Sequence, residues 1–162
     1  MSFLADNPDV FPTAIKKANV PDLSSNFGNM GEGEWDRIET LEQDGRVKLA
    51  KAAGLEEVTL DLKITDTQII IAFQDAGKEV VAIAFDKNLL RREIKDYALV
   101  LQTYRAAIRT AAAPVVQQID ASRRDIHNAG AKKLQTILHK DGAELGMSAA
   151  RSVFYLIANR LG

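Results

Sequence analysis

The chain of 162 residues has no cysteine and only two histidines. Without cysteine it can form no disulfide, no thiolate metal site and no thiol nucleophile. The two histidines are His127 and His139. On one helix this separation corresponds to about 18 Å, too far for both imidazoles to bind the same metal ion. The sequence therefore predicts no metal site.

Long apolar runs are also missing. No stretch approaches the roughly 20 apolar residues that a membrane-spanning helix needs. Residues 1–12 are short, acidic and broken by Pro8, unlike a secretory signal. We therefore expect a cytoplasmic protein without a membrane partner. The 46% apolar content is nevertheless enough for a folded core.

Motifs for nucleophilic or phosphate chemistry are absent as well. There is no Gly-x-Ser-x-Gly pattern, and no Gly-x-Gly-x-x-Gly or Walker-type loop follows an expected strand. Paired carboxylates for acid–base work are not evident. The sequence predicts no catalytic residue and no cofactor, and it favours a non-enzymatic protein while leaving an enzyme open.

The net charge of −1 hides an asymmetry between the two halves of the chain. Residues 1–86 carry 8 Lys and Arg against 16 Asp and Glu, whereas residues 87–162 carry 13 against 6. Such a division is typical of a basic surface for an acidic partner or nucleic acid. It equally suits two halves of one fold that attract each other.

The composition changes along the chain near residue 33. Residues 1–33 hold three of the four prolines and many Asn, Ser and Gly residues, which predicts a weakly ordered N-terminal segment. Residues 34–162 are predicted to form a single α+β domain. Its first elements are expected to be a helix over residues 34–44 and a helical turn over residues 47–53.

The middle of the chain predicts β-strands. Between residues 58 and 85, three apolar stretches are separated by short turns, which predicts a three-stranded antiparallel meander. The first stretch shows the alternation of a half-buried strand at Val58, Leu60, Leu62 and Ile64.

The remainder predicts helices over residues 88–112, 114–140 and 147–161. Their apolar residues recur at intervals of three and four. A tight connection near Ala113 makes the first two a long antiparallel helical hairpin, followed by a C-terminal helix that covers the sheet. Such helices pack within one chain or in a homodimer.

A polar group interrupts the apolar stripe of the second long helix. Arg123 lies about 40° from Ile119 around the helix axis, inside the stripe. A guanidinium there needs an acid, an aromatic ring or a bound anion. The candidates form either an anion-binding site or a structural polar cluster, in which Arg123 pairs with an acid: Asp96, Asp120, Arg123, Arg124, His127 and Asn128.

The hairpin also predicts two contacts between its helices. If the chain reverses near Ala113, Tyr104 lies close to Arg123 and stacks on its guanidinium. In the same alignment, Tyr97 lies close to Gly130 and fills the space that its missing side chain leaves. A glycine inside a helix costs about 1 kcal/mol relative to alanine, so a packing reason is expected.

Residues 58–162 resemble an alphaproteobacterial family, the uncharacterised protein family 0262. The resemblance is carried by residues 90–97, 104–111 and 149–157, and most specifically by the Arg-Arg-x-x-His-Asn-x-Gly run that starts at Arg123. The family's usual glutamate after His-Asn is Ala129 here, and its cysteine in the first long helix is missing near Leu101. The resemblance implies no established activity.

Three functions remain open. The first is a non-enzymatic protein-interaction or regulatory protein with a protein partner. The second is an anion-binding, phosphate-binding or enzymatic domain centred on Arg123, Arg124 and His127. The third is nucleic-acid binding through the basic C-terminal helices, where Arg91-Arg92 and Lys132-Lys133 would have to share one surface.

Overall fold

The strands of the sheet follow the apolar alternation of the sequence. The computed structural model describes residues 5–20 and 33–161. In β3 (Glu57–Ile64), the side chains of Val58, Leu60 and Leu62 are buried, and polar residues alternate with them. β4 (Gln68–Asp75) pairs antiparallel with β3 and with β5 (Lys78–Asp86). The buried face of these strands supplies one side of the core.

The sheet is larger than the three strands predicted from the sequence. Three further strands are β1 (Thr13–Asn19), β2 (Arg46–Leu49) and β6 (Ala143–Leu145), which extend it to six strands in the order β5-β4-β3-β1-β2-β6. β1 pairs parallel with β3 and antiparallel with β2. The α+β class is confirmed, and the sheet is mixed.

The N-terminal segment contributes to this sheet. Residues 1–33 were expected to be weakly ordered, which is wrong for β1, a strand between β3 and β2. A register shift between Ile15 and Lys17 breaks the alternation in β1, so Thr13, Ile15 and Ala18 are the buried residues. Residues 1–4 and 21–32 lie outside the described part of the chain, and the domain boundary at residue 33 stays a prediction.

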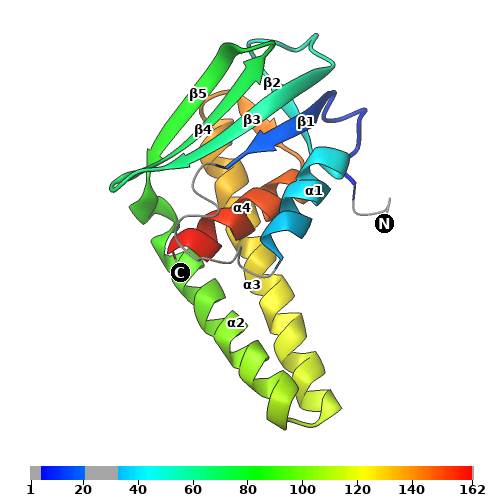
Figure 1. Ribbon diagram of the computed structural model, residues 1–162, viewed down its shortest axis with the longest axis vertical. Helices are drawn as coiled ribbons and strands as arrows, with labels where there is room; N and C mark the ends of the chain where they lie inside the picture. Colours follow the sequence, from blue (N-terminus) through cyan, green and yellow to red (C-terminus); the bar gives the residue numbers. More distant parts are fainter. Residues whose placement is uncertain (1–4, 21–32, 162) are drawn as a thin grey trace.

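Four α-helices lie on one side of the sheet (Figure 1). α2 and α3 run side by side away from the body of the molecule as a long arm, and α4 packs against α1 and α3 (Figure 1). Most residues of α4 are buried. The helices are α1 (Glu34–Asp44), α2 (Arg91–Thr110), α3 (Ala113–His139) and α4 (Met147–Leu161), with a short 3-10 helix η2 (Lys87–Leu90) before α2.

Several local expectations need correction. Residues 46–49 form β2 instead of a helical turn, because Val47 and Leu49 face the core of the sheet and β2 pairs on both sides. Trp35 is 64% exposed, whereas Ile38 and Leu41, which follow it at intervals of three in α1, are buried. Ile108 is 54% exposed, and Ala107 is buried in its place. In the outer part of the arm the apolar seam is therefore less well covered than its spacing suggests.

Gly130 is needed where α3 crosses α4. A Cβ atom at this position would overlap the ring of Phe154 on α4. The expected neighbour, Tyr97, lies beside Phe154 with ring centroids 5.9 Å apart and does not itself fill the space. The packing reason for a glycine is therefore present, but the ring that occupies the space belongs to Phe154. No helix in the described ranges is both long and apolar enough to span a bilayer.

Candidate functional site

Arg123 has two partners on the arm. Its Nη2 and Nε atoms donate to Asp120 Oδ1 at 2.7 and 3.0 Å, and its guanidinium carbon lies 5.2 Å from the ring centre of Tyr104. The stacking on Tyr104 is the contact expected from the hairpin. Burial lowers the pKa of Arg123, but the hydrogen bonds to Asp120 outweigh this effect and raise it. The same bonds hold the pKa of Asp120 below its ordinary value.

The other predicted site residues do not gather around Arg123 as one site. Arg124 Nε lies 3.6 Å from Asp120 Oδ2, on the solvent side of α3. Asp96 lies 3.9 Å from Arg92 on α2 and forms no ion pair with Arg123, so Asp120 is the acid that pairs with it. Asn128 Oδ1 is buried without a hydrogen-bond partner among the described residues. Asp120, Arg123 and Arg124 thus form a satisfied ionic group.

His127 lies in the core and links α3 to α4. Its side chain is fully buried, and Nε2 lies 2.8 Å from the backbone oxygen of Arg151. A carbonyl only accepts, so Nε2 carries the proton and donates to it. Nδ1 is then unprotonated, and it has no partner among the described residues. The ring packs against Tyr97 with centroids 5.1 Å apart.

This environment keeps His127 neutral. Burial lowers its pKa to about 3, an effect opposed by the bond to Arg151 and strengthened by the positive charges of Arg37, Arg151 and Arg123. A neutral imidazole at ordinary pH neither attracts an anion by charge nor transfers a proton readily. His127 therefore positions α4.

The two arginines whose charges lower the pKa of His127 most, Arg37 and Arg151, line the same cavity. Arg37 of α1 and Arg151 of α4 line a cavity of about 460 Å³, together with Thr40, Ser148 and Ser152. Neither arginine forms an ion pair with a carboxylate in the described part of the chain. Arg37 instead lies over an aromatic ring of α4, that of Tyr155, at 5.2 Å.

Arg151 is held in an unfavourable setting. Burial lowers its pKa, and the positive charges of Arg37 and Arg123 lower it further. Its Nε atom is buried and has no hydrogen-bond partner among residues 5–20 and 33–161. Ser152, also on the cavity wall, is fully buried with an Oγ atom that has no partner within the same ranges. Arg151 and Ser152 thus both line the cavity, and each has a buried polar atom without a hydrogen-bond partner among the described residues.

One carboxylate does reach this cavity, but its oxygens are already used. Asp6 accepts hydrogen bonds from the backbone nitrogens of Ser148 at 2.6 Å, Ala149 at 3.1 Å and Arg46 at 3.0 Å. It thereby caps the first turn of α4. Burial raises the pKa of Asp6 despite these bonds. The carboxylate of Asp6 thus acts as a cap for the first turn of α4.

The sequence analysis missed both cavity arginines. Arg37 lies far from α4 in the sequence, which concealed their contact. A signal was available for Arg151, because it is a lone cation within the apolar and small residues 147–158. The same reasoning that selected Arg123 applies to it. Groups of three or more His, Cys, Asp or Glu side chains suited to a metal ion do not occur among the described residues.

Comparison with known sequences identifies the family. The model of a family described as "Uncharacterised protein family (UPF0262)" matches residues 35–160, which include nearly all of α1 and of α4. The chain belongs to UPF0262. The predicted resemblance is confirmed, and it extends upstream of residue 58 to include Arg37.

UPF0262 proteins of similar length occur in several bacteria. One from Azorhizobium caulinodans is 35% identical over 122 residues, covering 74% of this chain and 75% of its own. One from Xanthobacter autotrophicus is 28% identical over 158 residues, covering 95% and 96%. One from Brucella anthropi is 32% identical over 99 residues, covering 60% and 61%. No solved structure matches the chain significantly.

Proposed function

We propose that this UPF0262 protein binds a small oxyanion, such as phosphate or a phosphorylated or carboxylated metabolite, between Arg37 and Arg151. The observation that carries the proposal is that both arginines line one cavity and neither has a carboxylate partner within the described residues. This assignment moves the anion site expected at Arg123, Arg124 and His127 to Arg37 and Arg151.

The chemistry of the cavity suits an oxyanion. Guanidinium groups bind phosphate and carboxylate oxygens through paired N–H donors, and such charge-assisted bonds are stronger than neutral ones. The buried Oγ of Ser152 adds a hydroxyl donor. An anion would also relieve the repulsion between Arg37, Arg151 and Arg123 that lowers the pKa of Arg151. The proposal concerns binding and includes no reaction.

His127 would contribute by fixing Arg151. Its Nε2–H group bonds to the backbone oxygen of that residue, so the imidazole holds the first half of α4 against α3. Preorganised donors cost less to order when a ligand binds. We therefore expect changes at His127 to weaken anion binding indirectly.

Calorimetric titration with inorganic phosphate tests the proposal. We expect Arg37→Gln and Arg151→Gln each to weaken phosphate binding at least tenfold, because each removes a charge from the cavity wall. Arg124→Gln is the matched control, since Arg124 pairs with Asp120 and does not line the cavity. Equal losses in all three variants would instead indicate a general effect of net charge.

A second function is favoured by a separate observation on the arm. Ile108 and Val115, on either side of the turn between α2 and α3, are 54% and 46% exposed. The neighbouring Ile119 and Leu101 are only half-buried. We propose that the protein also acts through protein contacts, with a second copy as the partner. Two arms laid together would cover these residues as the helices of a four-helix bundle do.

Light scattering on a sizing column tests self-association. We expect a dimer for the unchanged chain and a monomer for the double variant Ile108→Asp with Val115→Asp. Leu89→Asp is the matched control, because Leu89 is also exposed but lies in η2, before the arm begins. A monomer at all concentrations for the unchanged chain contradicts this second proposal. Nucleic-acid binding through the basic helices stays a prediction.

A further inference from the structure

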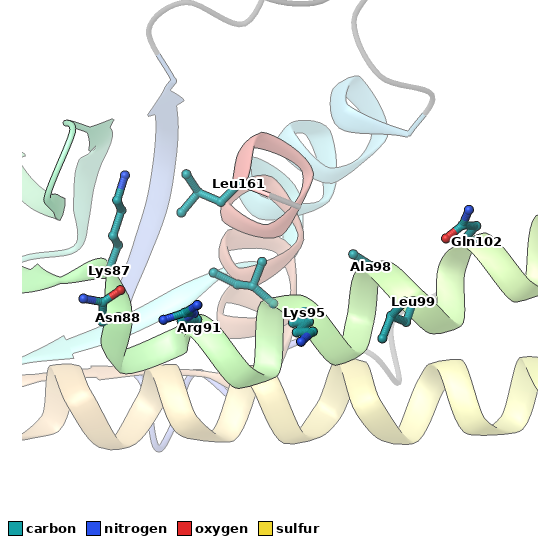
Figure 2. A pocket seen from close by; sticks show the side chains of 9 residues that line it. Lys87, Asn88, Arg91, Lys95, Ala98, Leu99, Gln102 and Leu161 are labelled. Carbon is teal, nitrogen blue, oxygen red and sulfur yellow. The ribbon is translucent and has the colours of Figure 1, made fainter.

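A second cavity lies at the base of the arm, and neither Arg37 nor Arg151 lines it. It has a volume of about 410 Å³ and is formed by η2, the first half of α2 and the end of α4 (Figure 2). Its size is within the range of small-molecule sites. It shares no lining residue with the proposed oxyanion cavity.

One end of this cavity is strongly basic. Lys87, Arg91 and Lys95 all line it; Arg91 and Lys95 are four residues apart and so lie on one side of α2, and Lys87 adds a third cation from η2. None of the three forms an ion pair within the described ranges. The nearby Asp86 is occupied, because its side chain accepts a hydrogen bond from Asn88 N at 2.8 Å. Like charges at this spacing repel each other unless an anion lies between them.

The N-terminus of α2 reinforces this charge. The helix begins at Arg91 and has 20 residues, and its dipole places positive potential at its first turn. The lysines and the arginine at this end therefore add to a field that already attracts an anionic group.

Beyond Lys95, the lining on α2 is apolar at Ala98 and Leu99 before it ends at Gln102 (Figure 2). Leu161 of α4 lies over Arg91, at the basic end (Figure 2). Ile94, which is only 5% exposed, lies between Arg91 and Lys95 in the sequence and also lines the cavity. Leu99 is 54% exposed, an arrangement that leaves an apolar surface in contact with water next to a basic one.

We infer that this cavity binds a free medium-chain carboxylate. The carboxylate would accept hydrogen bonds from Lys87, Arg91 and Lys95, and its alkyl chain would cover Ala98 and Leu99. The positive charge of the basic end is complementary to a carboxylate head group, and the short apolar end has room for a single alkyl chain. The polarity of the site also fixes the direction of the ligand, with its tail pointing along α2 toward the turn of the arm.

Calorimetric titration of the full chain with decanoate, below its critical micelle concentration, tests this inference. Acetate has the head group without the chain, and decan-1-ol has the chain without the charge. We expect both to bind at least tenfold more weakly than decanoate. Equal binding of decan-1-ol would overturn the role of the basic end, and equal binding of acetate would overturn that of the apolar end.

Two variants locate the site. We expect the double variant Arg91→Gln with Lys95→Gln to weaken decanoate binding at least tenfold, and Leu99→Asn to do the same through the apolar end. All three side chains are exposed, so the fold should tolerate these changes. Arg92→Gln is the matched control, because Arg92 is 88% exposed, pairs with Asp96 and does not line the cavity.

The remaining outcomes separate this site from the alternatives. Unchanged decanoate affinity in both cavity variants overturns the inference, as does binding to phosphatidylglycerol vesicles without binding of free decanoate. Arg151→Gln should leave decanoate binding unchanged while it weakens phosphate binding. The two proposals can therefore fail independently.

Discussion

His127 Nε2 donates to the backbone oxygen of Arg151 at 2.8 Å, which joins the middle of α3 to the first half of α4. The bond places a neutral imidazole behind a charged arginine that faces a cavity. His127 thereby fixes the helix that carries Arg151. The second cavity arginine, Arg37, comes from α1.

The first prediction concerns pH. The pKa of His127 is lowered to about 3 from 6.5, so below pH 6.5 the unfolded chain gains a proton that the folded chain does not. The contribution of His127 to the free energy of unfolding is therefore complete above pH 6.5. It decreases by about 1.4 kcal/mol per pH unit as the pH falls from 6.5 toward 3. Urea unfolding at pH values from about 7 to about 5, a range that spans the ordinary histidine pKa, measures this slope.

His127→Gln is the control for that slope. A glutamine amide keeps a donor for the oxygen of Arg151 but cannot take up a proton. We expect the difference in stability between the unchanged chain and the variant to shrink as pH falls. Parallel pH dependences for the two proteins would show that His127 is protonated in the folded state.

The second prediction concerns Gly130. Alanine normally stabilises a helix relative to glycine by about 1 kcal/mol, but a Cβ atom here would overlap the ring of Phe154. We therefore expect Gly130→Ala to lower the free energy of unfolding by about 1–3 kcal/mol. Gly54→Ala is the matched control, since a Cβ atom there meets nothing within 4 Å. A stabilised Gly130→Ala variant would contradict the packing described.

The third prediction concerns the N-terminal segment. Asp6 accepts hydrogen bonds from three backbone nitrogens of β2 and α4. Asp6→Ala leaves these donors buried without an acceptor, which we expect to cost about 1–3 kcal/mol in denaturant unfolding. Asp9→Ala, at an exposed position in the same segment, should have little effect. Equal stability of both variants would mean that residues near Asp6 do not contribute to the fold.

The fourth prediction concerns the stacked pair on the arm. Arg123 lies over Tyr104 and is hydrogen-bonded to Asp120 within α3. Its side chain is 21% exposed, so water partly screens the interaction. We expect Tyr104→Leu to cost only about 0.5–1 kcal/mol, the value typical of an exposed cation–π contact. A cost as large as that of Gly130→Ala would show that the arm depends on this pair.

Local patterns predicted the elements that depend on local sequence. The helix at residues 34–44 has the bounds of α1, and the alternation at Val58, Leu60 and Leu62 is that of β3. The stack of Tyr104 on Arg123 followed from the reversal of the chain between α2 and α3. Each of these depends on the helical or strand period and on a short connection.

The missed elements depend on partners that are distant in the chain. β2 and β6 are four and three residues long, and they exist because Val47 pairs with Leu145. β1 was hidden by its register shift. Long-range pairing decides such short strands, and their own residues carry little periodicity.

The candidate site was only partly predictable for the same reason. The sequence left Asp96 and Asp120 open as the acid for Arg123, and the structure pairs Arg123 with Asp120, three residues away on the same helix. Arg37 and Arg151 are separated by most of the chain, and only the packing of α1 against α4 brings them to one cavity. Gly130 suggested a packing partner but could not identify Phe154.

The most direct test of the central claim is a phosphate titration followed through the arginine Nε–Hε signals in NMR spectra. We predict that phosphate shifts the signals of Arg37 and Arg151, because these guanidinium groups line the proposed cavity. The signal of Arg124, which pairs with Asp120 on the solvent side, should stay in place. Unchanged Arg37 and Arg151 signals at saturating phosphate would contradict the account.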